Sequence, residues 1–396
     1  MAANPPADRQ ASPSVWQWMD DAARNARTFW QRVTDGVNIA DLWTQFQSEA
    51  RSSYGLYSRE VDWDAVEKSK RWQRPFRAGS QLFWAMLTKL TPARRVLLLV
   101  AMLFLVLDLI PSSERSSDAG IHFPSLAVFA LFLLLALELA DRVTMKRDLE
   151  IAREIQRWLV PEKPPKIPGY DIAFLSRPAN TVAGDYYDTI PRGVARDPAA
   201  AGGKLLLVVA DVAGKSVPAA LLMATFQASL RAIEATGPQL ADLLHSLNFY
   251  VCENSRNGLR FITAFFAELE PSTGRLQFTS AGHHPALVRR AAGDVAELGE
   301  GGLPLGIEFD EKFPVGEAAL APGDLMLIYT DGLVEAVNAK GEEFGKDRVT
   351  NLLFPCDPQV SAADALGHVT RALDNFVGME RQHDDITCLV VRRLPG

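Results

Sequence analysis

Apolar residues are concentrated in two runs in the first half of the chain. VLLLVAMLFLVLDLI covers residues 96–110, and IHFPSLAVFALFLLLALELA covers residues 121–140. A helix of about 20 mostly apolar residues is long enough to cross the hydrocarbon core of a bilayer. We therefore predict two transmembrane helices, at about 93–111 and 121–140, joined by a short polar loop. The alternative is a helical hairpin buried in a soluble domain.

Basic residues flank these two runs on their outer sides. Arg94 and Arg95 precede the first run, and Arg142, Lys146 and Arg147 follow the second. Because cytoplasmic flanks carry an excess of Lys and Arg, both ends of the hairpin should face the cytoplasm. The predicted location is the inner (cytoplasmic) membrane, crossed twice, with membrane lipid as a partner.

Residues 1–91 form a segment rich in tryptophan. Its tryptophans alternate with charged and amide residues at roughly helical spacing, at Trp16, Trp18, Trp30, Trp43, Trp63, Trp72 and Trp84. This pattern predicts amphipathic helices of unknown role. They either pack on one another, lie at the lipid interface or bind a partner.

Residues 142–165 form a predicted linker helix with a proline-rich end. Within it, residues 145–160 carry apolar side chains at Leu149, Ile151, Ile155 and Leu159 with charges between them. Pro161 ends the helix, because proline lacks the amide that the helical ladder requires. The stripe indicates either a homodimer through the linker helix or packing of one helix on the following domain.

From residue 166 to the end of the chain, strand patterns alternate with helical ones. Helices are predicted at 218–235, 240–255 and 362–377. Strands are predicted at 171–176, 204–210, 261–270, 275–280, 286–290, 324–329 and 386–392. Strands joined mostly by hairpins, together with a few helices, indicate an α+β layered fold.

Composition limits the classes of function. The 396-residue chain has a formal charge of −7 and no clustered Lys/Arg surface, which argues against nucleic-acid binding. Its three cysteines are far apart in sequence and predict neither a zinc site nor a disulfide framework. Acidic side chains are better suited to a metal site.

Several aspartates stand where predicted strands end or begin. Asp211 follows the run KLLLVVA, Asp331 follows DLMLIYT, Asp185 lies in GDYYD, and the pair Asp384 and Asp385 precedes the last strand. Hard oxygen ligands from separate strand ends suit Mg²⁺ or Mn²⁺. Each motif alone is weak, since Asp-Gly is common in turns and the acidic pair is equally explained by solvation.

The order of these motifs is more informative than any one of them. GDYYD, ADVAGKSVPAALLMA, FITAFF, SAGHHP, YTDGLVEA and DDIT follow one another between residues 184 and 387. This succession strongly resembles the PPM (protein phosphatase 2C-like) family, and within it the bacterial SpoIIE/RsbU-like branch of sigma-factor-regulator phosphatases. The resemblance implies a β-sandwich of two antiparallel sheets flanked by helices over residues 166–396.

The resemblance also implies roles for individual residues. Asp211 would bridge two metal ions, and Asp185 and Asp211 would be the catalytic carboxylates. The implied metal ligands are Asp185, Asp211, Asp331, Asp384 or Asp385, and the carbonyl of Val212, with Asp384 preferred because it is the first residue of its motif. Two departures from the family pattern, Ser216 and Ala183, replace residues that are often glycine.

The activity implied by the resemblance is hydrolysis of phosphoserine or phosphothreonine by water activated by two or more Mn²⁺ or Mg²⁺ ions. The implied partner is a phosphorylated regulatory protein, a STAS-type anti-sigma-factor antagonist. His283 and His284 are either a general acid or part of a structural turn. The alternatives are a signalling scaffold that only binds a phosphoprotein and a small-molecule phosphohydrolase.

Overall fold

The computed structural model describes residues 73–109, 122–193, 198, 203–214, 216–255, 260–353 and 360–395. The chain divides into two compact units, residues 1–139 and 140–396, which are considered separately. The predicted Trp-rich segment before residue 73 and the loop between the two apolar runs lie outside the described residues.

The first unit contains α4 (Arg74–Lys89), α5 (Pro92–Leu109) and the N-terminal part of α6 (Phe123–Leu159). Arg94 on α5 joins these helices, because its guanidinium lies 3.1 Å from the Glu138 carboxylate and also donates to the Leu137 carbonyl of α6. Large apolar side chains face outward, with Val106 53% and Leu135 65% exposed. Such a surface is unusual for a helix in water.

Helix α6 is longer than the predicted span. The second apolar run and the predicted linker form one continuous helix, which ends at Leu159, immediately before the proline-rich segment. Among the described residues, α6 is the one helix that is long and apolar enough to cross a membrane, judged by length and composition alone. The 18-residue α5 carries Arg94, Arg95 and Asp108, so the two-helix membrane hairpin remains a prediction.

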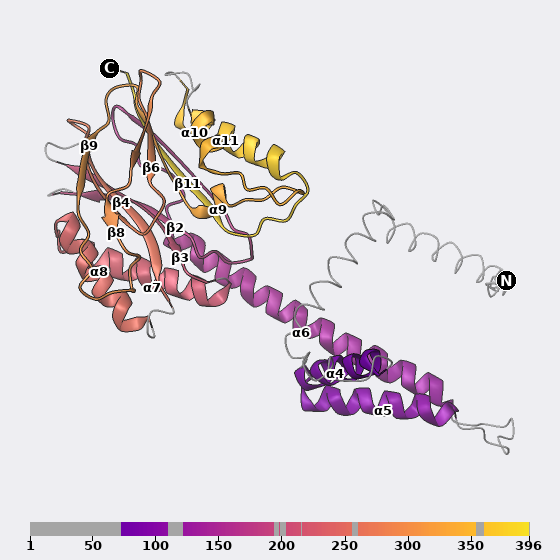
Figure 1. Cartoon of the computed structure of the whole chain (residues 1–396). Helices are drawn as coiled ribbons and strands as arrows, with labels where there is room; N and C mark the ends of the chain where they lie inside the picture. The colour runs from indigo at the N-terminus through magenta and orange to yellow at the C-terminus, as the bar shows by residue number, and fades with distance from the viewer. Residues whose placement is uncertain are drawn as a thin grey trace, which may run out of the picture. The chain divides into compact units, whose positions relative to one another are not determined.

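The second unit is built on two β-sheets (Figure 1). The five-stranded sheet has the order β1 (Tyr170–Arg177), β11 (Ile386–Arg393), β10 (Leu325–Tyr329), β6 (Ala286–Arg289) and β7 (Val295–Leu298). The six-stranded sheet contains β2 (Tyr186–Arg192), β3 (Lys204–Val212), β4 (Ile262–Glu270), β5 (Arg275–Ala281) and β8 (Gly301–Gly302), while β9 (Gly316–Ala319) pairs with β5.

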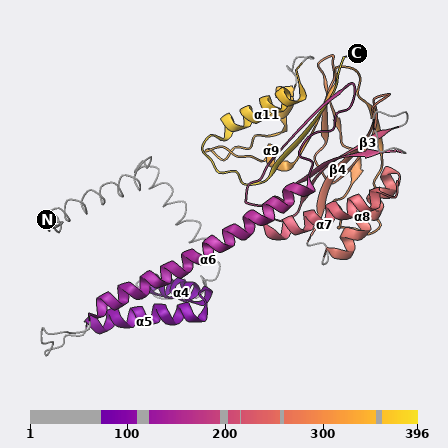
Figure 2. The same cartoon turned by 180° about the vertical axis from the view of Figure 1, so that it is seen from behind.

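Helices cover the outer face of each sheet (Figures 1 and 2). Helices α7 (Val217–Glu234) and α8 (Leu240–Asn254) lie on the six-stranded sheet, and α9 (Asp331–Val334), α10 (Lys346–Leu353) and α11 (Ala362–Val377) lie on the other. Alternate side chains of β3 serve the two layers: Leu205 and Leu207 face the opposite sheet, whereas Leu206 and Val208 face α7 and α8. This alternation follows from the pleat of a strand, and it explains why β3 is apolar throughout.

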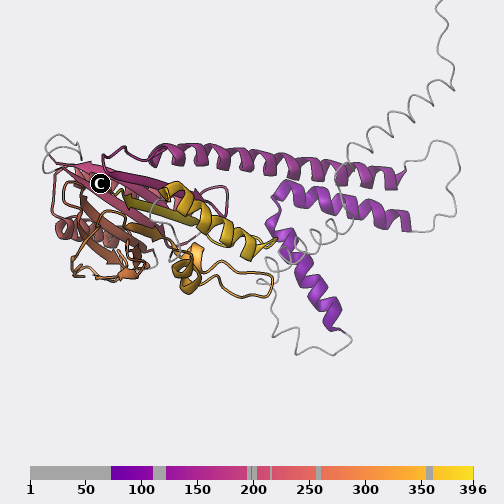
Figure 3. The same cartoon turned by 90° about the horizontal axis from the view of Figure 1, so that it is seen from above.

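The predicted α+β fold is confirmed, with corrections to its elements. Each strand and helix predicted after residue 166 is present, with ends that differ by at most two residues. The predicted linker helix at 142–165 is instead the C-terminal part of the long helix α6, which ends at Leu159 (Figure 3). Strands β2, β7, β8 and β9 and helices α9 and α10 were not predicted. The expectation of two purely antiparallel sheets is wrong at one pair, because β5 and β8 run parallel.

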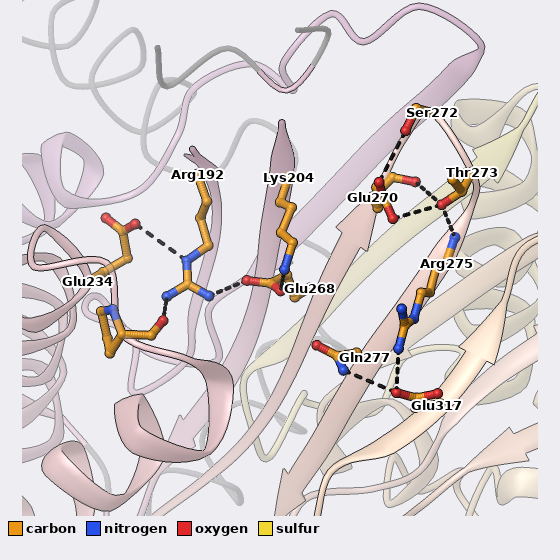
Figure 4. A network of polar contacts seen from close by, with 11 residues as sticks. Arg192, Lys204, Glu234, Glu268, Glu270, Ser272, Thr273, Arg275, Gln277 and Glu317 are labelled. Carbon is orange, nitrogen blue, oxygen red and sulfur yellow. Dashed lines mark hydrogen bonds and ion pairs between the residues drawn. The ribbon is translucent and has the colours of Figure 1, made fainter. Parts of the chain in front are cut away.

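A buried ionic network joins the ends of β2, β3 and β4 that lie away from the strand-end aspartates (Figure 4). The Arg192 guanidinium contacts both the Glu268 carboxylate and, at 3.5 Å, that of Glu234 on α7, and it donates to the Pro238 carbonyl at 2.5 Å. Lys204 reaches the other oxygen of Glu268 at 2.6 Å. Arg192 therefore holds two buried acids against the end of the sheet.

Replacing Arg192 by leucine should destabilise the second unit by about 3–5 kcal/mol, because two buried carboxylates would lose their shared cation. Chemical denaturation followed by circular dichroism of the full chain measures this loss. The matched control is Arg275→Leu, since Arg275 pairs with Glu317 at the surface, and exposed pairs contribute little to stability. Equal midpoints for Arg192→Leu and the unaltered chain would contradict the assigned role.

Candidate metal centre

The strand-end aspartates meet at one edge of the sandwich. In the six-stranded sheet, antiparallel pairing sets Tyr186 opposite Ala210, which brings the neighbouring Asp185 and Asp211 to the same end. In the five-stranded sheet, β10 ends beside the start of β11, which brings Asp331 to Asp384 and Asp385. Antiparallel topology thus gathers carboxylates that are up to about 200 residues apart in sequence.

Thr330 links the two halves of this edge. Its hydroxyl donates to the Asp185 carboxylate at 2.9 Å and accepts from the Thr387 amide at 2.9 Å. Thr330 is fully buried and directly precedes Asp331. One side chain from the five-stranded sheet therefore fixes the orientation of a carboxylate at the start of β2, in the other sheet.

The two aspartates before β11 have different environments. Both carboxylate oxygens of the buried Asp385 accept backbone hydrogen bonds, from Ala179 at 2.7 Å and from Gly184 at 2.6 Å. Asp385 therefore anchors the loop that carries Asp185. Asp384 is more exposed, and one of its oxygens accepts from the Asp385 amide at 3.0 Å.

Two glycines allow the segments to approach one another. A Cβ at Gly332 would lie 2.0 Å from the Asp385 carbonyl oxygen, so no larger residue fits between Asp331 and the acidic pair. A Cβ at Gly184 would lie 3.3 Å from the Val212 carbonyl oxygen. Backbone contact at these two positions holds the carboxylates close together.

Burial and mutual repulsion disfavour ionisation of these carboxyls. Burial, followed by the charge of Asp211, raises the pKa of Asp185 well above its usual value. Burial, followed by the charges of Asp331 and Asp384, raises the pKa of Asp211 to about 7. Positive charge beside this cluster would offset the repulsion and favour the ionised carboxylates.

The donor set fits hard divalent cations. Asp185, Asp211, Asp331, Asp384 and the Val212 carbonyl supply only oxygen, the ligand type that Mg²⁺ and Mn²⁺ prefer. Within the described part of the chain, no three His, Cys, Asp or Glu side chains converge tightly enough to hold an ion unaided. Ligation here would therefore need the carbonyl and water as well, which is usual for Mg²⁺.

The histidines of the SAGHHP motif have structural environments. His283 is buried, its backbone exchanges two hydrogen bonds with the Ser280 hydroxyl, and its Nδ1 lies 3.1 Å from the Thr263 hydroxyl. Burial, together with His284, lowers the pKa of His283 to about 3. His284 stacks on Tyr329. This geometry favours the structural turn over the general acid.

The second aspartate of GDYYD serves the fold. Asp188 is fully buried, and its carboxylate contacts Arg231 of α7 at 2.6 Å and accepts from the Tyr186 hydroxyl at 2.5 Å. Thr330 and Asp188 were not singled out from the sequence. No spacing rule indicates their partners, which lie on other elements.

Helix α6 contacts the metal-ligand loop directly. The Gln156 side chain donates to the Ala183 carbonyl at 2.9 Å and accepts from the Ala183 amide at 3.0 Å. Ala183 is two residues before Asp185. The second unit therefore joins the last turns of α6 to the segment that positions a candidate ligand.

Ser216 has a backbone conformation that favours glycine. It is the one non-glycine residue with positive φ in the described part of the chain, at 66°, and it directly precedes α7. The substitution noted in the sequence thus falls where the family's usual glycine would relieve strain. Its neighbour Lys215 lies outside the described residues.

Comparison with known proteins shows which families and relatives this chain is similar to in sequence. Residues 201–394 match the family model described as stage II sporulation protein E (SpoIIE). The chain is 28% identical over 252 residues to phosphoserine phosphatase RsbU of Bacillus subtilis, covering 63% of this chain and 71% of RsbU. It is 26% identical over 287 residues to protein IcfG of Synechocystis, covering 66% of this chain but only 43% of IcfG.

A solved structure shares the fold of the second unit. The SiaA-PP2C domain of Pseudomonas aeruginosa superimposes with a TM-score of 0.56 at 25% identity, covering 64% of this chain and 98% of that domain. The family resemblance read from the ordered motifs is confirmed. PP2C-type phosphatases depend on Mn²⁺ or Mg²⁺, in agreement with the all-oxygen donor set.

The raised pKa of Asp211 predicts that stability depends on pH when metal is absent. Because the folded-state pKa, about 7, exceeds the ordinary 3.8, this carboxyl favours the folded state at low pH. That contribution is lost as pH rises towards 7. With EDTA, the difference in unfolding free energy between the unaltered chain and Asp211→Asn should shift against the unaltered chain from pH 4 to pH 7. Denaturation at each pH tests this, and a constant difference would contradict it.

Proposed function

We propose that this chain, whose C-terminal domain belongs to the SpoIIE/RsbU-like branch of the PPM phosphatases, is a metal-dependent phosphatase of phosphoserine or phosphothreonine in proteins. One observation carries the proposal. Asp185, Asp211, Asp331 and Asp384 come from four separate strand ends and gather at one edge, where burial and mutual repulsion raise the pKa of Asp185 and Asp211. That arrangement is costly in a structural role and suits the binding of cations.

We assign the ligands from the environment of each group. Asp185, Asp211, Asp331, Asp384 and the Val212 carbonyl would hold two divalent cations, with Asp211 contributing to both, Asp185 and the Val212 carbonyl to one, and Asp331 and Asp384 to the other. Asp384 is preferred to Asp385 because both oxygens of Asp385 already accept backbone hydrogen bonds. Asp385 then acts as a positioning residue for Asp185.

Two divalent cations in this site would supply Lewis acidity, which makes hydroxide available near neutral pH and offsets the charge of the phosphate. The chain's own residues prepare the site for them. Thr330 orients Asp185, and Gly332 admits the acidic pair beside Asp331. Neutral His283 keeps its turn rigid and adds no charge.

The proposed substrate is a phosphorylated regulatory protein of the anti-sigma-factor-antagonist type. Support comes from the similarity to RsbU, which is named a phosphoserine phosphatase. The rival function, a scaffold that binds a phosphoprotein without hydrolysing it, would not require the four ligand carboxylates to be retained. A small-molecule phosphohydrolase is distinguished by its substrates rather than by its metal site.

Hydrolysis of p-nitrophenyl phosphate and of a phosphoserine protein by the full chain should require Mn²⁺ or Mg²⁺. Asp211→Asn should lower kcat by about 100-fold or more, because loss of one electrostatic stabiliser of a transition state costs at least that much. Asp384→Asn should weaken Mn²⁺ binding with little change in stability, whereas Asp385→Asn should lower stability as well.

Steady-state kinetics, Mn²⁺ titration and thermal melts distinguish these outcomes. No hydrolysis with metal present would favour the scaffold, and hydrolysis that does not depend on metal would contradict the proposed metal centre. Asp384→Asn and Asp385→Asn variants that behave identically would contradict the division of roles between the two aspartates.

We further propose that the chain is anchored in the membrane and dimerises through α6. The apolar first part of α6 supports the anchor. The second part exposes an unpartnered stripe, with Ile151 and Ile155 each 48% and Trp158 72% exposed. Spacings of four and three residues suit a parallel pair of helices, and two anchored copies would present the same stripe to each other. Gln156, on another face, contacts the phosphatase domain of its own chain.

A cysteine cross-link tests the anchor and the dimer together. After an alkaline wash, the chain should remain with membranes, and Trp158→Cys should form an oxidised dimer there. Lys146→Cys, an exposed position on the same helix but off the stripe, is the control and should cross-link much less. Release of the chain by the wash would contradict the anchor, and equal cross-linking at both positions would contradict the proposed interface.

A further inference from the structure

A cavity of about 180 Å³ is lined by residues from the last turns of α6, the start of β2 and α7. Its lining includes Arg153, Gln156 and Arg157 from α6, Thr181 and Asp185 from the loop before β2, and Met223 from α7. Asp331, Asp384 and Asp211 do not line it. The cavity therefore adjoins the metal centre through Asp185 without being the place where substrate phosphate meets the remaining ligands.

The lining of this cavity is positively charged. Arg153 and Arg157 are one helical turn apart, and neither has an ion pair or hydrogen bond with the part of the chain that the structure describes, although Glu150 and Glu154 share their helix. The one acidic lining residue is Asp185, whose carboxylate is held by Thr330. Ser176 and Thr181, which carry hydroxyl groups, also line the cavity.

Two unpaired guanidinium groups over a small cavity with hydroxyl donors are suited to a compact oxyanion. Arginine binds phosphate oxygens through paired N–H donors, and two arginines at i and i+4 project to the same side of a helix. Carboxylates are recognised by the same groups, but the additional hydroxyl-bearing residues in the lining favour a tetrahedral anion, which accepts bonds from several directions.

We propose that this cavity binds a phosphate-class anion, either inorganic phosphate or a small phosphate ester, as an effector site separate from the metal centre. The occupant would bridge α6 to the loop before β2. It would lie beside Gln156, whose side chain holds both backbone groups of Ala183. Anion binding would therefore stiffen the connection between α6 and the segment that positions Asp185.

Calorimetric titration of the full chain in detergent, with EDTA present, measures this site directly. EDTA removes the metal centre as a competing phosphate site, because the bare carboxylates repel anions. Inorganic phosphate should bind, and the double variant Arg153→Gln/Arg157→Gln should weaken its binding about tenfold or more. Arg147→Gln is the matched control, an exposed arginine on α6 that does not line the cavity.

Phosphoserine as a second titrant separates the two sources of the anion. Binding of phosphate alone identifies a free-phosphate site, and binding of both identifies a site for phosphate esters. The proposal is overturned if neither binds the unaltered chain, or if the double variant binds as tightly as Arg147→Gln. Circular dichroism of the double variant guards against misfolding as the cause of lost binding.

This site and the proposed phosphatase activity can fail independently. Manganese-dependent hydrolysis of p-nitrophenyl phosphate depends on the aspartates and should persist in the double variant. Anion binding in EDTA depends on α6 and should persist in Asp211→Asn. An anion site without hydrolysis would overturn only the phosphatase function, and hydrolysis without anion binding would overturn only the effector site.

Discussion

The repulsion among carboxylates buried at one edge of the sandwich is the constraint on which the other features depend. Burial and the charge of Asp211 raise the pKa of the buried Asp185, and burial with the charges of Asp331 and Asp384 raises the pKa of the half-buried Asp211. Hydrogen bonds from Thr330 and backbone contacts at Gly332 hold this arrangement against that repulsion. This edge of the fold therefore favours positive charge, which the proposed divalent cations would supply, so that the proposed catalysis and the stability of the edge would depend on the same ions.

The two ends of β2 and β3 differ in their electrostatics. At the end that carries Asp185 and Asp211, the two strands bring together carboxylates that repel one another. At the far end, the same strands carry Arg192 and Lys204, which meet Glu268 and Glu234 in a compensated network. The ion pairs at this end oppose the separation of the strands, which the repulsion between carboxylates at the other end would favour. Helix α7 contributes to both ends, because it begins shortly after Asp211 and ends at Glu234, which belongs to the ionic network.

The sequence predicted the framework of the site because strand-end aspartates obey a local rule. An apolar run such as KLLLVVA followed by Asp211 predicts a strand, and the point where it ends, from the local sequence alone. Thr330 and Asp385 could not be assigned in this way, because their partners, Asp185 and Gly184, lie about 145 and 201 residues away. Strand β2 was not predicted because its polar residues and Pro191 interrupt the pattern typical of a strand. Proline is tolerated there because β2 is an edge strand.

Helix α6 shows that packing on the phosphatase domain and the proposed dimer are compatible. The sequence offered a dimerising linker or a helix packed on the phosphatase domain, and a helix has enough faces for each. Gln156 is hydrogen-bonded to Ala183 of the domain, while Ile151, Ile155 and Trp158 on another face remain exposed. Because Gln156 is fixed to Ala183, rotation or shift of α6 by a second copy must either move the segment before Asp185 or break two hydrogen bonds. Asp185, the most deeply buried of the proposed ligands, would be the most sensitive to such movement, so a small displacement of the helix would change how well this edge accommodates the proposed cations.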